Sequence, residues 1–271
     1  MTAPAPLERD IQANGLRLHY LDWGGAGPPI VLLHGLRDQA HEWDPLAPAL
    51  TPLGRVLALD QRGHGENDTP PGGYAPDDFA ADLAAFCDAL ALDRPVIIGH
   101  SLGGRVAYHF AVAYPERLRA LVLIDIGAGS SPETIPAVVA FIEATAGPFA
   151  NPDDALRALL GGRLLPNAGT AHYLRHNLRQ GDDGLWCWKY DLDAAIAAVR
   201  AGRGRVPGTW SRASASPRCS CAAGVAMCSA PPTPPGCATP SPVPRWSSCR
   251  ASATSSRSPN RANSPRPSSP G

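Results

Sequence analysis

A serine flanked by two glycines points most directly to chemistry in this chain, in the run Gly99-His100-Ser101-Leu102-Gly103. A short apolar run precedes this G-x-S-x-G pattern and a helix-length stretch follows it. That order is typical of a tight strand-to-helix turn that presents the serine hydroxyl as a nucleophile. Glycines suit the flanking positions because such a turn leaves no room for a Cβ atom. The alternative is a structural turn whose serine only caps the following helix.

Two backbone N–H groups are candidates to stabilise the negative charge that attack by a serine creates on a substrate oxygen. The apolar run 30–33 ends in His34-Gly35, and we expect this turn to direct the N–H of Leu36 towards the reacting oxygen. The second donor is the N–H of Leu102, directly after the serine. Together these residues predict acyl transfer, with the serine as nucleophile and two N–H groups as the oxyanion hole.

A third polar turn, D-Q-R-G-H-G at 60–65, follows the apolar run 56–59. We interpret this turn as structural, and we expect Asp60 and Arg62 to pair with each other and to bind neighbouring backbone groups. Three histidines lie within the three motifs, and we expect structural roles for them: His34, His64 and His100.

Short apolar runs alternate with Ala- and Leu-rich stretches of helical length, and the runs lie at 30–33, 56–59, 96–98 and 121–124. Such alternation predicts an α/β fold with a mostly parallel sheet. No window approaches the length of a membrane span, and the first ten residues lack the apolar segment of a signal peptide. The formal net charge is zero. We therefore expect a cytoplasmic protein without nucleic-acid or membrane partners.

The motifs L-L-H-G, D-Q-R-G-H-G and G-H-S-L-G-G, in this order, resemble those of the α/β-hydrolase superfamily, specifically its esterase, lactonase and C–C hydrolase branch. The resemblance covers about Ile11 to about Arg203, within a core placed at 11–205. It implies that Ser101 is the nucleophile and that residues from about 127 to 203 form a helical lid. Dehalogenases and epoxide hydrolases of the superfamily carry aspartate at this position, so a serine implies acyl transfer. Three aromatic residues are similar to those that close such a lid over the site: Trp186, Trp188 and Tyr190. The alternative is that they pack within the lid without contacting a ligand.

The resemblance also implies a histidine base after the last strand, oriented by an aspartate after the preceding strand. The last histidine of the chain is His176, so no histidine lies where the base is expected. Asp125, after the run 121–124, is the fallback acid, although we favour a strand-end carboxylate that accepts backbone N–H bonds. His172 and His176 have i, i+4 spacing, which we interpret as a solvated lid helix because two ligands make a weak metal site. A triad of Asp125 with a lid histidine is a further alternative.

The composition changes near residue 205. Residues 206–271 contain 13 Pro, 15 Ser, seven Arg and five of the seven Cys, and lack Leu, Ile, Phe, Tyr, His, Gln, Lys, Asp and Glu. The first 205 residues therefore carry 24 acidic and 24 − 7 = 17 basic groups, a net charge of −7. A segment so poor in aliphatic residues cannot bury enough apolar surface to offset its ordering entropy. We expect a disordered tail in place of the last strands, and hence an exposed sheet edge and poor solubility.

A shift of reading frame would account for this composition. When the last base of each codon is read with the first two of the next, residues 221–229 permit R-G-x-x-S-D-V-L and residues 249–254 permit P-G-V-G-H. These runs resemble the acid and base motifs of the superfamily. The hidden acid falls at the Ala226/Met227 junction and the hidden base at Ala253/Thr254. We hypothesise a frame slip between about Val199 and Pro207, which leaves a nucleophile without its base.

These features predict a serine hydrolase, a carboxylesterase or lactonase acting on a small apolar ester, with weak or no turnover in this chain. The expected partner is a small-molecule ester, and no cofactor or metal is expected. The cysteines are expected to be unpaired thiols. The alternative is a non-catalytic α/β-hydrolase-like binding protein whose Pro/Arg-rich tail, with P-x-x-P at 231–234, recruits a partner.

Overall fold

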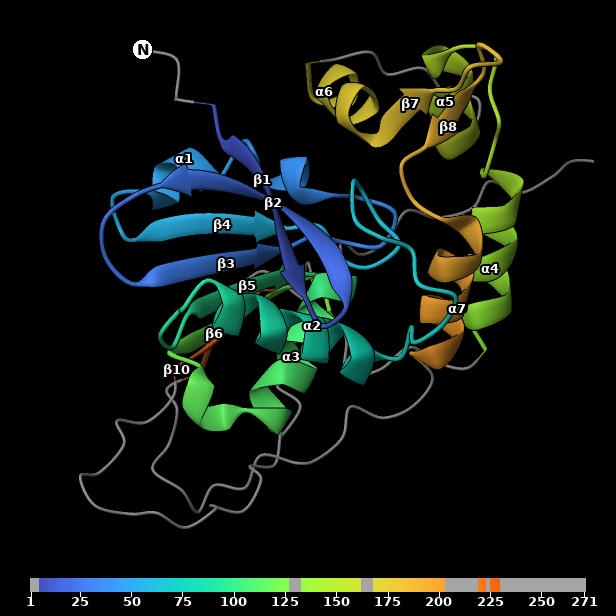
Figure 1. The fold of residues 1–271 in the computed structure, drawn as a ribbon. Coiled ribbons are helices and arrows are strands. Elements are labelled where there is room, and N and C mark those ends of the chain that lie inside the picture. Colours follow the sequence, from blue (N-terminus) through green and yellow to red (C-terminus); the bar gives the residue numbers. More distant parts are fainter. Residues whose placement is uncertain (1–4, 127–132, 162–167, 203–218, 223–224, 230–271) are drawn as a thin grey trace, which may run out of the picture.

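The computed structural model describes residues 5–126, 133–161, 168–202, 219–222 and 225–229. Its centre is an eight-stranded sheet with the order β1-β2-β4-β3-β5-β6-β10-β9, and a separate hairpin pairs β7 with β8 (Figure 1). The strands are β1 (Leu7–Ala13), β2 (Leu16–Gly24), β3 (Pro29–Leu33), β4 (Arg55–Leu59), β5 (Val96–His100), β6 (Ala120–Ile124), β7 (Leu178–Gln180), β8 (Trp186–Trp188), β9 (Cys219–Ala222) and β10 (Val225–Ser229). The helices are η1 (Ala40–Trp43), α1 (Ala47–Leu50), α2 (Pro76–Ala89), α3 (Leu102–Ala113), η2 (Pro115–Arg117), α4 (Ile135–Ala144), α5 (Pro152–Leu159), α6 (Ala168–Asn177) and α7 (Leu192–Ala201).

The four apolar runs expected as strands form the parallel centre of the sheet, from β4 through β3 and β5 to β6. This confirms the α/β fold with a mostly parallel sheet. Helices α2 and α3 connect β4 to β5 and β5 to β6, as the crossover between parallel strands requires. Because parallel strands end at the same edge, the residues that follow β3, β4, β5 and β6 gather there.

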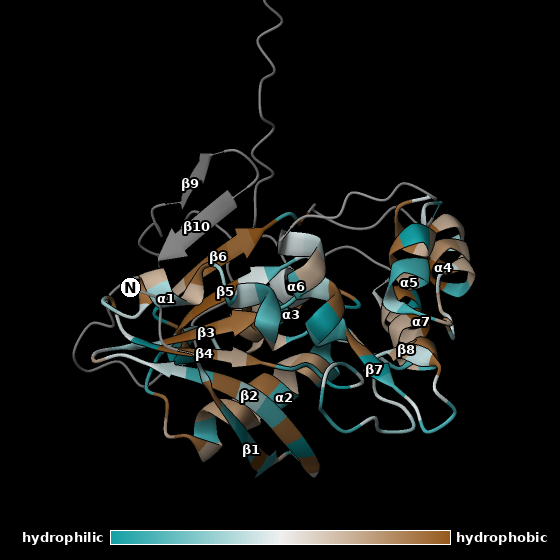
Figure 2. Ribbon diagram, turned by 90° about the horizontal axis from the view of Figure 1, so that it is seen from above, coloured by the Kyte–Doolittle hydropathy of each residue, from teal (hydrophilic) through white to brown (hydrophobic). Residues whose placement is uncertain are grey.

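Both faces of the central strands are buried, which explains their continuous apolar runs. Along β3, Val31 and Leu33 pack into the cluster that includes the α2 and α3 side chains. The alternate residues Ile30 and Leu32 pack on the opposite face, with Trp43 of η1. Figure 2 shows the resulting concentration of hydrophobic residues along β3 and β6.

The interval expected as a lid contains α4, α5, α6, the β7-β8 hairpin and α7. Helices α4, α5 and α7 lie to one side of the sheet in both Figure 1 and Figure 2. The N–H of Asp191 donates to the carbonyl of Gly63, 2.9 Å away, and thereby joins the start of α7 to the turn after β4. The lid region is therefore anchored on one of the three sequence motifs.

The described part of the C-terminal segment differs from the expectation of a disordered tail and an exposed sheet edge. Strand β10 pairs antiparallel with β6, and β9 pairs antiparallel with β10. A strand edge offers backbone N–H and C=O groups that any extended segment can bind, whatever its side chains. The edge of β6 is therefore covered, while the other residues from 206 to 271 lie outside the described ranges. No helix among the described residues combines the length and apolarity needed to cross a bilayer.

Candidate active site

Ser101 lies at a sharp turn between β5 and α3, with φ 48° and ψ −109°. This conformation is unfavourable for a residue with a side chain, and it persists only where its surroundings enforce it. A Cβ atom at Gly103 would lie 2.3 Å from the carbonyl oxygen of Leu33, and one at Gly99 would lie 2.3 Å from that of Gly103. Both flanking glycines are therefore sterically required, as the G-x-S-x-G pattern predicts.

The loop after β3 runs directly beside this turn. A Cβ atom at Gly35 would lie 3.7 Å from the Cβ of Ser101, and the N–H of Gly103 donates to the carbonyl of His34 at 3.0 Å. Leu102 is the first residue of α3, where the backbone N–H has no partner within the helix. Among the described residues, no acceptor binds the backbone N–H of Leu36 or of Leu102. This is compatible with the predicted oxyanion hole, and the role of the two N–H groups stays a prediction.

His34 is a structural residue that joins the first two motifs. Its buried imidazole accepts the N–H of Gln61 at Nε2, 2.9 Å away, and its Nδ1 donates to the carbonyl of Gly35 at 2.7 Å. The side chain of Gln61 donates in turn to the His34 carbonyl at 2.7 Å. Burial holds the pKa of His34 well below its usual range, so the ring stays neutral. Its nitrogens are occupied, and it is not available as a base for Ser101.

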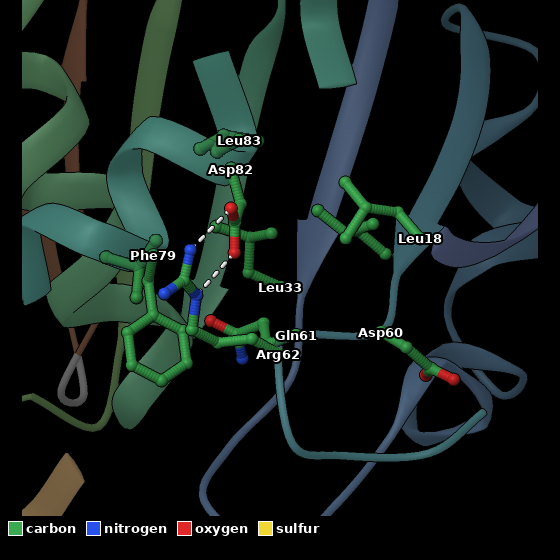
Figure 3. Close-up of a pocket in the computed structure, with 10 residues that line it drawn as sticks. Leu18, Leu33, Asp60, Gln61, Arg62, Phe79, Asp82 and Leu83 are labelled. Atoms are coloured by element: carbon green, nitrogen blue, oxygen red, sulfur yellow. Dashed lines mark hydrogen bonds and ion pairs between the residues drawn. The ribbon is translucent and has the colours of Figure 1, made fainter. Parts of the chain in front are cut away.

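The D-Q-R-G-H-G turn is structural, but its ion pair differs from the expected one. Arg62 binds Asp82 of α2 rather than Asp60, with Nε and Nη2 each 2.6 Å from a carboxylate oxygen (Figure 3). Asp60 instead accepts the N–H groups of Ala40 at 2.6 Å and Glu66 at 2.8 Å. The expected pairing of Asp60 with Arg62 is therefore wrong, whereas the expected binding of backbone groups by Asp60 is observed.

His100 is the histidine next to Ser101 in sequence, and it is held among acidic groups. Its Nδ1 lies 2.6 Å from Oε1 of Glu42, and its Nε2 lies 4.0 Å from Oδ2 of Asp125. The Glu42 carboxylate raises the pKa of His100, which favours the protonated ring. Among the described residues, no hydrogen bond joins this ring to the Ser101 hydroxyl, so the structure does not pair His100 with the serine as a base.

Asp125 directly follows β6 and has a φ of 50°. It lies beside the Ser101 turn, since the N–H of Ser101 donates to the carbonyl of the preceding residue, Ile124, at 3.0 Å. Its side chain is 87% exposed, and among the described residues it accepts no backbone N–H bond. The residues that follow closely after it, 127–132, lie outside the described ranges, so the favoured interpretation as a carboxylate that binds backbone N–H groups stays a prediction. Its role as the fallback acid remains a prediction.

The pairing of Glu42 with His100 should make the stability of the fold depend on pH. Because the folded-state pKa of His100 is raised above the unfolded value of about 6.5, the pair stabilises the fold fully below that pH. This contribution is lost as the pH rises through the folded-state pKa. We expect Glu42→Gln to lower the His100 pKa in an NMR titration and to reduce the free energy of unfolding more at pH 6 than at pH 9.

The matched control is Glu66→Gln, which removes the carboxylate paired with Lys189 at 2.8 Å. This control should leave the titration of His100 unchanged. An equal His100 pKa in the Glu42→Gln variant and the parent chain would contradict the pairing.

The lid histidines do not reach Ser101. His172 and His176 of α6 lie against η1, where their rings contact that of His41. Burial, together with the neighbouring His41 and His172, lowers the pKa of His176 to about 4, so this ring is neutral at pH 7. No hydrogen bond joins either ring to Asp125 or to the serine among the described residues, so the alternative triad is not assembled.

Sequence reasoning missed Arg37, directly after Leu36. Its guanidinium lies 5.0 Å from the ring centre of Tyr190, 5.9 Å from that of Trp188 and 5.5 Å from that of Phe141. The residue is only 7% exposed, and its Nε has no hydrogen-bond partner. Two of the three aromatic residues expected to close the lid thus surround a buried cation, and Trp186 pairs through its backbone with Phe149. Only the run W-C-W-K-Y-D signalled an aromatic cage.

Comparisons with known proteins give one family. A family model described as the alpha/beta hydrolase fold matches residues 28–181, more than half of the chain. The chain is 35% identical over 143 residues to 2-(acetamidomethylene)succinate hydrolase of Mesorhizobium japonicum, covering 53% of this chain and 51% of that protein. It is 38% identical over 117 residues to N-formylmaleamate deformylase of Pseudomonas putida, covering 43% of this chain and 44% of that protein. The matches therefore span about half the length of these relatives, or less.

Solved structures of α/β hydrolases superpose on this chain as well. A crystal structure of E-2-(acetamidomethylene)succinate hydrolase superposes with a TM-score of 0.68 and 28% identity, over 74% of this chain and 75% of that one. An α/β hydrolase from Novosphingobium aromaticivorans superposes with a TM-score of 0.61 and 30% identity, over 70% of each chain. With its parallel sheet and its serine at the strand-to-helix turn after β5, the chain belongs to the α/β hydrolase fold family.

Proposed function

We propose that this chain is a serine hydrolase, of the carboxylesterase or lactonase type, that carries the nucleophile and the oxyanion hole but not the base. The observation that carries the proposal is the backbone of Ser101, held at φ 48° by two glycines that accept no Cβ. Such a strained turn is maintained at sites that present a nucleophile, whereas a serine that only caps a helix needs no positive φ. Its side chain indeed makes no capping bond to α3.

The mechanism follows from the atoms around this turn. The Ser101 hydroxyl attacks the carbonyl carbon of the ester, and the carbonyl oxygen gains negative charge. The N–H groups of Leu36 and Leu102 bind that oxygen and stabilise the intermediate. The alcohol leaves, and water then hydrolyses the acyl-serine. Without a positioned base, the serine proton passes to solvent water and the leaving oxygen takes a proton from water. This transfer is the slow step, because both nitrogens of His34 are bonded and Nδ1 of His100 lies against the Glu42 carboxylate.

The proposal includes the frame slip between about Val199 and Pro207. It would place an aspartate codon at the Ala226/Met227 junction, which lies within β10, and a histidine codon at 253/254, outside the described residues. In the chain as it stands, neither side chain exists, and turnover is weak or absent. A mutation that removes the base of such a triad lowers kcat by up to roughly 10⁶-fold.

A serine-directed fluorophosphonate tests the nucleophile. We expect slow covalent labelling at Ser101, located by peptide mass spectrometry and absent in Ser101→Ala. Free imidazole added as an external base should accelerate labelling by roughly 10-fold or more, since a positioned base contributes about 10²- to 10⁴-fold. A non-catalytic binding protein would give no adduct at this serine, with or without imidazole, and that result would reject the proposed function.

Arg37 favours a second candidate, hydrolysis of an acylated amide that carries carboxylates. The Nη2 of Arg37 donates to the carbonyl of Thr145 at 3.3 Å, its Nε has no partner, and no carboxylate among the described residues pairs with it. Such a buried guanidinium is suited to bind an anionic group. Two relatives are named for 2-(acetamidomethylene)succinate and N-formylmaleamate, which are compounds of this kind. Protection of Ser101 from labelling separates the candidates: a neutral ester protects under the first, and a carboxylate-bearing amide under the second.

A further inference from the structure

Three histidines and one aspartate meet between the core and the lid. His41 belongs to η1, and Asp44 is the first residue after this helix. His172 and His176 lie one turn apart on α6. Nδ1 of His41 is 2.9 Å from Oδ2 of Asp44, and Nε2 of His172 is 3.3 Å from the same oxygen. The ring centres of His41 and His176 are 3.8 Å apart, and those of His172 and His176 are 4.5 Å apart.

The spacing of these groups suits a small divalent cation. One ligand atom each from His41, Asp44 and His176 can be chosen so that all three lie within 4.8 Å of one another. A tetrahedral zinc ion with bonds of about 2.0–2.2 Å sets its ligand atoms about 3.3–3.6 Å apart. Side-chain rotations that move each ligand atom by about 1 Å therefore bring the three atoms to coordination distance.

The second observation concerns the carboxylate of Asp44. Its Oδ1 atom is buried and has no hydrogen-bond partner, although an unpartnered buried carboxylate oxygen is costly. The side chains around it remain accessible, since His41 is 15% exposed and His172 is 34% exposed. An ion bound by Asp44 would therefore offer this carboxylate the partner that the described residues do not give to Oδ1.

We propose that His41, Asp44 and His176 form a binding site for a first-row transition-metal ion, with Zn²⁺ as the preferred occupant and His172 beside the fourth coordination position. Imidazole nitrogens with a single carboxylate oxygen are a donor set that Zn²⁺, Co²⁺ and Ni²⁺ accept and that Ca²⁺ and Mg²⁺ disfavour. The sequence alone offers only two ligands, His172 and His176, which make a weak metal site. The fold supplies the other two from a segment about 130 residues earlier.

The position of this site indicates what the ion would do. The segment that carries His41 also carries Glu42, the partner of His100, and starts from the loop of Leu36. Near the same end of α6, Nδ2 of Asn177 donates to Oδ1 of Asp38 at 3.0 Å. A metal ion would thus fasten α6 of the lid to the loop that shapes the oxyanion hole. It would act as a clip between lid and core rather than on the substrate.

Zinc binding to the full, tag-free chain tests the proposal. After chelator treatment and alkylation of the thiols, Zn²⁺ is titrated in competition with a chromophoric chelator. We expect one ion per chain and a higher melting temperature with zinc than without it. Because loss of a second-shell partner already lowers metal affinity by about 10- to 100-fold, His41→Ala and His176→Ala should each lower it by about 100-fold or more.

His109→Ala is the matched control, because this histidine of α3 pairs with Asp77 of α2 and lies far in sequence from the cluster. It should bind zinc as the parent chain does. His176→Gln keeps the polar volume and guards against a folding defect, which circular dichroism of the metal-free chains checks. An absence of saturable binding, or binding unchanged by His41→Ala and His176→Ala in folded chains, would overturn the proposal.

Discussion

Restoring the alternative frame downstream of residue 199 is expected to raise kcat for ester hydrolysis by up to roughly 10⁶-fold. Under the proposed function, Ser101 and the N–H groups of Leu36 and Leu102 already supply the nucleophile and the oxyanion hole, so the restored histidine has only to accept the serine proton. The measurement is hydrolysis of a chromogenic short-chain ester by the two chains, each with its Ser101→Ala variant as the background.

The control is the restored chain with alanine in place of the new histidine. This variant should fall back to the rate of the present chain, because the nucleophile and oxyanion hole alone give only residual catalysis. If the restored chain is no faster than the present one, the frame-slip hypothesis and the missing-base explanation of weak turnover both fail. Sequencing of the gene across codons 195–271 shows which frame is the natural one.

The second large effect is expected from Asp82→Asn, which should lower the free energy of unfolding by about 3–5 kcal/mol. Arg62 and Asp82 form two 2.6 Å hydrogen bonds, and their side chains are only 7% and 5% exposed. The Asp82 carboxylate also accepts from Nδ2 of Asn14 at 2.7 Å. Removing its charge leaves the Arg62 guanidinium buried without a counterion, which costs far more than the loss of one hydrogen bond. Urea unfolding monitored by circular dichroism measures the change.

The same helix supplies the matched control for this substitution. Asp88 of α2 pairs with Arg117, but its side chain is 68% exposed. Asp88→Asn makes the same chemical change in solvent and should cost no more than about 1 kcal/mol. Equal effects of the two substitutions would show that burial does not determine the strength of the Arg62–Asp82 pair.

Local patterns in the sequence predicted the elements that position the nucleophile. The runs at 30–33, 56–59, 96–98 and 121–124 lie in β3, β4, β5 and β6, and the helix expected after Ser101 is α3. These features are predictable because apolar runs bounded by turn residues, and glycines in a turn that excludes Cβ atoms, are set by neighbours in the chain.

Contacts between distant segments were not predictable in this way. The sequence suggested that Arg62 pairs with Asp60 two residues earlier, whereas the fold brings it to Asp82 on α2. The cage around Arg37 and the meeting of His41 with His176 likewise depend on how the lid packs on the core. Strand β10 forms in a segment of unfavourable composition because the edge of β6 offers it hydrogen-bonding groups. Tertiary packing, rather than local preference, determines each of these contacts.

The contacts between the loop after β3 and the Ser101 turn determine which fragments of the chain could keep this region together. The hydrogen bonds that join the three motifs, from the Gly103 N–H to the His34 carbonyl and between Gln61 and His34, lie within residues 34–103. A break in the chain after β6 would therefore leave the bonds that join the three motifs within one fragment. A complementing fragment would join at β6, where β10 already occupies the edge, so complementation would proceed by strand exchange.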